Sequence, residues 1–399
     1  MTASQVRPTA TDRLTDAATR LWPDQSVTVG GTAEGARELV FVPHARAPRA
    51  LVPAGRPAAA AAVVRRFSHV LTARERAGRL AVAAALRLGG ERLLPDRLRI
   101  HPPRSADSIE TRLSDLLGRD VVVAVTVGSV RANQKPVLAV LDTRGRTVAF
   151  VKVGDTPRTA DLVRREAAAL GEVGSRAPAP LEPPRLLHLG PWRGLELLVI
   201  SALDTVARPS HRPVLHPPAA AMAALAAAFD GGTHPLGRTR FWRDLVEVAT
   251  SVTDGPTRDR YIDALTAISA EYGERPVRLG AWHGDWTPWN MAWRGRRLQL
   301  WDWEQFAVGV PCGLDRVHYV LNTVARRSGF RPGWVDAGLR TRAVRAHADP
   351  DEQHLLVLVY LAAITARYLR GSEGTDGAIL RETTAEVLDA LVRFAAGRR

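Results

Sequence analysis

The sequence predicts an α+β fold in which an N-terminal extension precedes a β-rich lobe and a mainly helical lobe. Short runs of valine, leucine and isoleucine recur over residues 111–203 and predict a mainly antiparallel sheet with one helix. Alanine- and leucine-rich stretches dominate residues 204–399 and predict helices around a single β-hairpin. Residues 1–110 combine a hairpin-like pattern with an arginine-rich helical stretch. We therefore expect three parts with these boundaries.

The extension carries no recognisable chemistry. Its residues 37–43 and 49–53 are expected to pair as a hairpin, and 57–88 to be helical with a break near Ser68. A further strand is expected over 98–100. This pattern favours a structural extension that packs on the β-rich lobe.

The β-rich lobe is expected to contain strands and one helix. Runs of apolar residues predict strands over 121–127, 136–142 and 147–153. Strong helix formers over 159–170 predict the helix, with Thr159 or Asp161 as its N-cap. The proline-rich residues 176–184 are expected to form a loop inside the fold and not a domain linker.

The most informative motif lies in the helical lobe, where residues 283–290 read His-Gly-Asp-Trp-Thr-Pro-Trp-Asn and 300–304 read Leu-Trp-Asp-Trp-Glu. Phosphoryl transfer requires a carboxylate that accepts the proton of the attacking hydroxyl. It also requires an amide and a second carboxylate that hold Mg²⁺ on the phosphates. Asp285, Asn290 and Asp302 are these three residue types in that order. The joint pattern therefore indicates a kinase-type site.

The segment between these residues predicts how the metal ligands would meet. Two apolar runs, 291–293 and 298–301, flank Gly295 and favour a β-hairpin. In an antiparallel hairpin Asn290 and Asp302 would fall almost opposite each other. Two oxygen ligands for one hard cation would then lie side by side.

Lysine usage gives a second signal. Of 55 basic Lys and Arg residues only Lys135 and Lys152 are lysine, so a retained lysine suggests a position that the wide arginine fork cannot fill. Lys152 lies in an apolar strand, where it needs an anionic partner. Glu166 is the expected partner, because it lies within the apolar stripe of the following helix between Leu162 and Leu170. A strand lysine paired with a helix glutamate positions ATP phosphates in kinases.

These motifs together resemble the aminoglycoside phosphotransferase and choline-kinase-like family of the protein-kinase-like, two-lobed fold. That family shows His-Gly-Asp-x-x-Pro-x-Asn and then an Asp in a short apolar strand, often followed by Trp-Glu. The resemblance runs from about residue 110 to the C-terminus. The matching residues are His283, Gly284, Asp285, Pro288, Asn290, Asp302, Trp303 and Glu304, together with Lys152 and Glu166.

The resemblance implies a role for each matched residue. Asp285 would be the catalytic base, Asn290 and Asp302 would bind Mg²⁺, and Lys152, paired with Glu166, would contact the phosphates of ATP. In similar proteins the residues that stand at Glu304 and Asp315 brace the site.

The nucleotide loop departs from the wider pattern, because no Gly-x-Gly-x-x-Gly run occurs. Gly128 and Ser129, between the first two strands of the lobe, stand where the phosphate loop is expected. The resemblance also implies that residues 195–203 form the strand leading into the hinge, where backbone near Ala202 would meet the adenine. Trp289 stands at a position where the family that the sequence resembles usually has a smaller residue. Trp286 and Trp289 are interpreted as packing residues, with stacking on a ring-bearing acceptor as the alternative.

Composition bounds the remaining possibilities. A single cysteine, Cys312, excludes a disulfide framework, and no signal peptide or membrane span is expected, so we predict a cytoplasmic protein. The formal charge of +14 comes from dispersed arginines, which does not favour nucleic acid as a partner. The sequence gives no indication of oligomeric state.

We therefore expect an ATP- and Mg²⁺-dependent phosphotransferase that acts on a small-molecule hydroxyl, with a neutral sugar or amino alcohol favoured over a polycationic aminoglycoside. Two other classes stay open. One is an ATP-binding regulatory pseudokinase, and the other is a basic nucleic-acid-associated protein.

Overall fold

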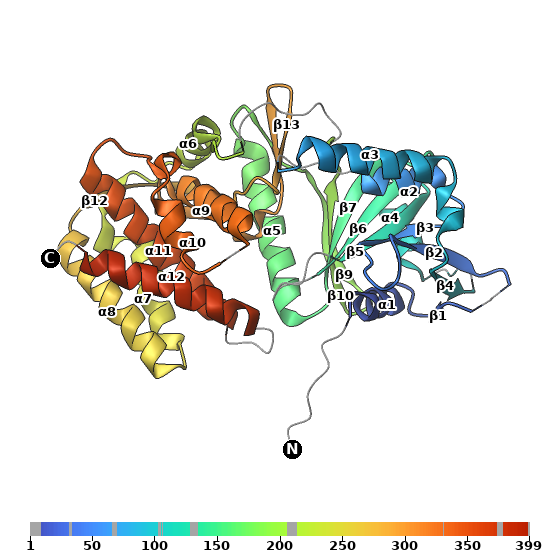
Figure 1. Ribbon diagram of the computed structural model, residues 1–399, viewed down its shortest axis with the longest axis horizontal. Helices are drawn as coiled ribbons and strands as arrows, with labels where there is room; N and C mark the ends of the chain where they lie inside the picture. Colours follow the sequence, from blue (N-terminus) through green and yellow to red (C-terminus); the bar gives the residue numbers. More distant parts are fainter. Residues whose placement is uncertain are drawn as a thin grey trace, which may run out of the picture. The chain divides into compact units, whose positions relative to one another are not determined.

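A computed structural model describes residues 9–31, 34–65, 70–102, 105, 107–127, 135–205, 214–329, 331–372 and 378–397 (Figure 1). The chain divides into two compact units. The first comprises residues 1–67, 71–167 and 184–206, and the second comprises 68–70, 168–183 and 207–399. Strands and helices are both abundant, which confirms the predicted α+β class.

The first unit is built on one nine-stranded sheet in the order β1-β4-β2-β3-β5-β6-β7-β10-β9. All of its neighbouring strands are antiparallel. The strands are β1 (Ser26–Val29), β2 (Arg37–Val42), β3 (Ala50–Pro53), β4 (Arg97–His101), β5 (Val121–Val127), β6 (Pro136–Asp142), β7 (Thr147–Gly154), β9 (Leu186–Trp192) and β10 (Leu195–Ser201).

The strands of residues 1–110 continue the sheet of the expected β-rich lobe. The predicted hairpin exists, since β2 pairs with β3, and β3 then pairs with β5 through Ala50 and Thr126. We keep the three-part division as a proposal, in which the extension is built into the same sheet.

Helices cover both faces of this sheet. They are α1 (Ala10–Leu21), α2 (Pro57–Val64), α3 (Ala73–Arg87), α4 (Ile109–Leu117) and the first part of α5 (Pro157–Arg176), whose residues from 168 on belong to the second unit, with a 3₁₀ turn, η1, over Gly90–Leu93. Alternating residues of β5 point to opposite faces. Val123 lies in a core cluster with residues of α1 and α4, whereas Ala124 lies in a second cluster with residues of α2 and α3.

The predicted start of α5 is wrong by a few residues. Thr159 and Asp161 were the expected caps, but the helix begins at Pro157. Thr156 accepts a hydrogen bond from the Thr159 backbone N–H (3.2 Å), and Thr159 Oγ1 accepts one from the Thr156 N–H (2.9 Å). This reciprocal pair satisfies two amide groups at the helix start, and the fixed φ of proline suits the first helical position.

The second unit is mainly helical. Its helices are α6 (Ala219–Ala228), α7 (Arg240–Ser251), α8 (Gly255–Tyr272), α9 (Leu314–Ser328), α10 (Trp334–Leu339), α11 (Pro350–Ser372) and α12 (Ala378–Ala396), with 3₁₀ turns η2 (Leu236–Arg238), η3 (Trp303–Gln305) and η4 (Arg342–Val344). Among the described helices α11 alone is long and apolar enough to cross a membrane, but 78% of its apolar window is buried inside the protein, as in a core helix.

Two small sheets accompany these helices. One has the order β11-β12-β15, from Thr233–Pro235, Pro276–Trp282 and Ala307–Pro311. The other has the order β13-β14-β8, from Met291–Arg294, Arg297–Leu300 and Leu181–Glu182. The short strand β8 lies in the stretch 176–184 that was expected to be loop, because Leu181 and Glu182 pair in parallel with β14.

Candidate active site

The predicted hairpin is present and consists of strands β13 and β14. β13 pairs with β14 from Met291↔Leu300 to Arg294↔Arg297, with Gly295 in a left-handed conformation at the turn. The ladder extends one step further, because the Trp301 N–H donates to the Asn290 carbonyl (3.0 Å). Asp302 follows Trp301 directly, so the hairpin brings Asn290 and Asp302 to the same end of the two strands, as predicted.

Asn290 fixes one side of the Asp285 carboxylate. Its Nδ2 donates to Asp285 Oδ2 (2.8 Å) and to the Asp285 carbonyl oxygen (3.0 Å). Because both bonds use the amide nitrogen, the carboxamide oxygen of Asn290 is directed away from Asp285. An amide oxygen is a suitable ligand for a hard cation.

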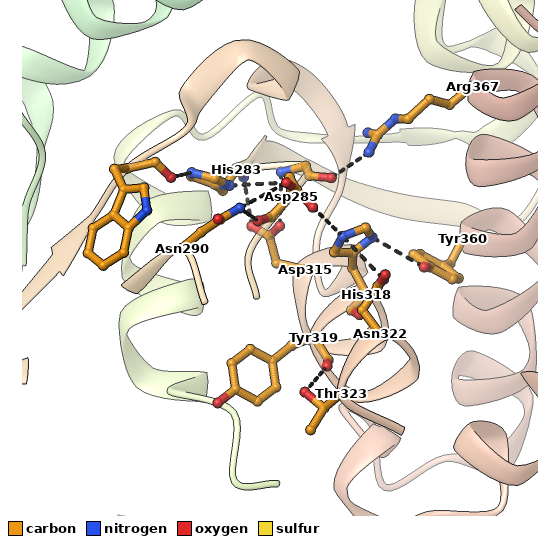
Figure 2. Close-up of polar contacts among 12 residues, drawn as sticks. His283, Asp285, Asn290, Asp315, His318, Tyr319, Asn322, Thr323, Tyr360 and Arg367 are labelled. Carbon is orange, nitrogen blue, oxygen red and sulfur yellow. Dashed lines mark hydrogen bonds and ion pairs between the residues drawn. The ribbon is translucent and has the colours of Figure 1, made fainter. Parts of the chain in front are cut away.

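His318 fixes the other side of that carboxylate (Figure 2). Its Nε2 lies 3.1 Å from Asp285 Oδ1, and the Asp285 side chain keeps 31% of its surface exposed. Burial raises the pKa of Asp285, but the hydrogen bond from His318 acts in the opposite direction, and the pKa lies below the ordinary value. Asp285 is therefore an ionised, partly accessible hydrogen-bond acceptor at neutral pH.

Helix α9 holds the backbone of the loop just before Asp285. Asp315, in the first turn of that helix, accepts hydrogen bonds from the backbone N–H groups of His283 (2.7 Å) and Gly284 (3.0 Å). Burial raises the pKa of Asp315 to about 7, against the effect of these two bonds. The bracing role expected for Asp315 is confirmed.

His283 is a structural residue of this loop. Its ring is fully buried; Nδ1 accepts from the Asp285 N–H (3.2 Å), and Nε2 lies 3.1 Å from the Trp301 carbonyl oxygen. Burial lowers the pKa of His283 to about 4, so the ring is neutral at pH 7. A neutral ring with Nε2–H donating to Trp301 and Nδ1 accepting matches both contacts.

Helix α11 supplies a second set of contacts. Arg367 Nη1 donates to the Gly284 carbonyl (2.6 Å), and the guanidinium lies over the Trp282 ring at 5.0 Å. Tyr360, seven residues earlier and thus on the same side of the helix, has its hydroxyl 3.2 Å from His318 Nδ1. Helices α9 and α11 therefore hold the loop together (Figure 2).

Gly284 is required where the loop turns. Its φ is +77°, and a Cβ at this position would overlap the carbonyl oxygen of Gln305. Glycine adopts this left-handed backbone without the steric cost that a side chain adds. The glycine of the motif is thereby explained by close backbone packing.

The predicted Lys152–Glu166 ion pair is present in the first unit. Lys152 Nζ lies 2.6 Å from both Glu166 carboxylate oxygens, and the two residues are only 5% and 0% exposed. Leu162 and Leu170 flank Glu166 on the buried face of α5, as the helical periodicity predicted. The pairing is confirmed, and its role toward a nucleotide stays a proposal.

Two further nucleotide contacts were predicted from the sequence, at Gly128 and Ser129 and at Ala202. Gly128 and Ser129 lie outside the described residues. Ala202 follows β10, and its backbone N–H donates to the Val148 carbonyl oxygen (3.3 Å). An adenine at this position would therefore have to use the Ala202 carbonyl oxygen or the backbone of a neighbouring residue.

The residues at the hairpin fit a magnesium ion better than a metal held by protein alone. Within the described parts of the chain, no group of three or more His, Cys, Asp or Glu side chains converges into a metal cage. Mg²⁺ keeps several waters and binds through one or two protein oxygens plus substrate phosphates. Asn290 and Asp302 offer one amide oxygen and one carboxylate at adjacent positions, which is such a set.

Sequence reasoning missed three residues of this site, His318, Tyr360 and Arg367. His318 stands three residues after Asp315 on α9, so helical spacing could have placed it near the loop once Asp315 was chosen. Tyr360 and Arg367 lie in a mostly buried apolar helix, where only the tertiary structure reveals their contacts.

The two loop tryptophans differ from each other. Trp286 is fully buried and packs edge-on against His283, with ring centroids 6.0 Å apart, which is the packing role expected for it. Trp289 is half-buried, and the Arg326 guanidinium lies 5.0 Å from its ring centroid. Of the two, Trp289 alone retains surface that an acceptor could contact.

No family model and no curated protein matches the sequence. Among solved structures, the chain matches aminoglycoside phosphotransferase APH(4)-Ia at 18% identity with a TM-score of 0.47, over 73% of this chain and 99% of that one. A thermostable mutant of APH(4)-Ia, in ternary complex with ADP and hygromycin B, matches at 18% identity and a TM-score of 0.48, over 73% and 100%.

A third match is the GDP and kanamycin complex of an APH(2″) enzyme, at 15% identity and a TM-score of 0.42, over 72% of this chain and 98% of that one. The matched proteins are thus aminoglycoside phosphotransferases, the family that the sequence resembles. At such identities the likeness concerns the fold alone, so we argue function from the side chains of this chain.

Proposed function

We propose that the chain is an ATP- and Mg²⁺-dependent kinase that transfers the γ-phosphoryl group of ATP to a hydroxyl group of a small molecule. One observation carries the proposal. The ionised Asp285 carboxylate is held at both oxygens, by Asn290 and His318, while the oxygen of the Asn290 amide is left for a cation beside Asp302. This is the residue set that phosphoryl transfer requires.

In the proposed reaction Asp285 orients the acceptor hydroxyl and takes its proton. The hydroxyl oxygen forms a bond to the γ-phosphorus, the bond from that phosphorus to the bridging oxygen breaks, and ADP leaves. The low pKa of Asp285 favours orientation, with proton transfer late in the reaction. That order suits a loose transition state in which the hydroxyl gains little bonding before the leaving group departs.

The remaining residues hold the nucleotide. When bound to Asn290 and Asp302, Mg²⁺ would neutralise charge that develops on the phosphate oxygens. Lys152 would contact the phosphates as a compact point charge, and Glu166 holds its ammonium in place. We also propose the backbone near Ala202 as the adenine contact and Gly128 and Ser129 as the phosphate loop.

For the acceptor we propose a neutral sugar or amino alcohol. Two cationic side chains lie against the loop that carries Asp285, Arg326 at Trp289 and Arg367 at Gly284. A polycationic aminoglycoside would require acidic partners. We propose a cytoplasmic location, where ATP is abundant and the single Cys312 stays reduced.

The proposal is tested with Asp285→Asn, a nearly isosteric change. We expect Mg²⁺-ATP affinity to change less than two-fold while transfer to an acceptor, found by screening a hydroxyl library for ADP release, falls about 10²–10⁴-fold. Asp302→Ala should instead weaken Mg²⁺-ATP binding as well as turnover, because it removes a metal carboxylate. Circular dichroism confirms that both variants fold.

The alternative of a regulatory pseudokinase predicts a different result. The wild-type protein would then bind Mg²⁺-ATP without transfer to any acceptor, and Asp285→Asn would change nothing. The intact set of Lys152, Glu166, Asp285, Asn290 and Asp302 favours the enzyme.

A further inference from the structure

We infer that His318 is a positioning residue for this reaction. As a neutral hydrogen-bond donor whose tautomer is set by Tyr360, it fixes the rotation of the Asp285 carboxylate. The inference rests on the proposed function and assigns a role to a histidine that lies outside the sequence motif.

The contacts form a chain from α11 to the reacting carboxylate. Tyr360 Oη lies 3.2 Å from His318 Nδ1, and His318 Nε2 lies 3.1 Å from Asp285 Oδ1 (Figure 2). His318 is 2% exposed and Tyr360 is 1% exposed, so water does not compete with these bonds. The two ring nitrogens are thus each assigned to one partner.

Protonation states follow from the partners. An ionised carboxylate only accepts hydrogen bonds, so Nε2 of His318 must carry a proton to bond Asp285. Burial lowers the pKa of His318, which favours the neutral ring, and a neutral ring with Nε2–H has an acceptor at Nδ1. Burial also keeps Tyr360 protonated by raising its pKa well above the ordinary value, so its hydroxyl donates to Nδ1.

Asn322 lies one turn after His318 on α9. Its Nδ2 donates to the His318 carbonyl oxygen (3.0 Å) and lies 3.3 Å from Nε2. An amide nitrogen only donates, so with Nε2 protonated this second approach is a contact and not a hydrogen bond. In the opposite tautomer a bare Nε2 would accept from Asn322 and lose its bond to Asp285.

The consequence concerns the lone pairs of Asp285. A carboxylate held at Oδ2 alone, by Asn290, can still rotate about its Cβ–Cγ bond. A second donor at Oδ1 stops that rotation and leaves the remaining lone pairs aimed in a fixed direction. Because His318 is neutral, it orients the base without adding a positive charge next to it. Small errors in the placement of a reacting group can cost about 10²-fold in rate.

The test compares two replacements of His318. Leucine fills similar space without a donor, whereas glutamine places an amide N–H near the position of Nε2. We expect His318→Leu to lower kcat about 10–100-fold with the KM for Mg²⁺-ATP changed less than two-fold, and His318→Gln to recover most of the loss.

Tyr360→Phe should lower kcat only a few-fold, since Nε2–H survives in part. Thr323→Val serves as the control for α9, because it removes only a bond to the Tyr319 carbonyl oxygen within the helix.

Several outcomes would overturn the inference. A His318→Leu enzyme with at least half the wild-type kcat would do so, as would a His318→Gln enzyme as slow as the leucine variant, since the loss would then reflect packing. Should the leucine variant fail to fold, ¹⁵N spectra of the wild-type imidazole decide. Protonated Nε2 with bare Nδ1 supports the inference, and the opposite tautomer contradicts it. A wild-type protein that transfers no phosphoryl group would overturn the proposed function. An active wild type together with an equally active His318→Leu variant would overturn only the role of His318.

Discussion

At the residue scale, sequence predicts the Lys152–Glu166 pair better than it predicts the surroundings of Asp285. Lys152 and Glu166 could be paired in advance, because one is a rare lysine in an apolar strand and the other lies in a helix stripe. The rotation of Asp285 could not, because it depends on His318, which is 33 residues away in sequence. Local patterns identify which residue types are present, whereas contacts between distant segments set their orientation.

Lys152→Arg is expected to impair ATP use. The ammonium of Lys152 lies 2.6 Å from both carboxylate oxygens of Glu166, and only 5% of Lys152 is exposed. The broader guanidinium of arginine cannot occupy the same position. We expect kcat/KM for ATP to fall about 10–100-fold, equivalent to about 1.4–2.8 kcal/mol. The matched control is Lys135→Arg at the other lysine of the chain. Equal losses in the two variants, or no loss at Lys152, would contradict the proposed role.

At the element scale, the β13–β14 hairpin, helix α5 and strand β8 were predicted with unequal success. The β13–β14 hairpin was expected from its apolar runs and its glycine, and its register is as predicted. The start of α5 was misplaced because Thr156, Pro157 and Thr159 together offer a better cap than Thr159 alone. The pairing of β8 with β14 could not be foreseen, since it joins short segments far apart in the chain.

Gly284→Ala is expected to damage both stability and activity. The left-handed backbone costs an alanine about 1–2 kcal/mol, and the added Cβ meets the Gln305 carbonyl oxygen. Gly295→Ala is the control, because Gly295 has φ +58° but open space around its Cβ position. In urea unfolding, Gly295→Ala should lose about 1–2 kcal/mol with kcat retained, and Gly284→Ala should lose more and also lose kcat. Equal effects at both glycines would show that the contact with Gln305 is unimportant.

At the scale of the whole molecule, the extension is the part that sequence predicted least. Its hairpin and helices were expected, but strand β4 lies between β1 and β2, and β3 joins the sheet to β5. Such long-range pairing is not encoded in local periodicity. One buried contact joins separate parts of the extension. Trp22 Nε1, just after α1, donates to Glu110 (2.8 Å) in α4, which also pairs with Arg37 in β2.

Trp22→Ala tests whether this sheet is one cooperative unit. Trp22 is fully buried, so its truncation should lower the unfolding free energy of the first unit by about 3–5 kcal/mol. Hydrogen exchange should then show reduced protection in β5, β6 and β7 together with β2 and β4. Leu80→Ala, at a side chain that is 47% exposed, is the control and should change little. Loss of protection confined to residues 1–110 would instead identify a separately folding extension.

The contacts of α9 with the loop have a consequence for insertions and deletions. Asp315, His318 and Arg326 meet the loop at His283 and Gly284, at Asp285 and at Trp289, so the order along the helix follows the order along the loop. One inserted residue in a helix rotates everything after it by about 100° and shifts it by about 1.5 Å. An insertion between Asp315 and His318 would leave the brace in place and turn His318 away from Asp285. The length of this segment of α9 is therefore fixed by the site.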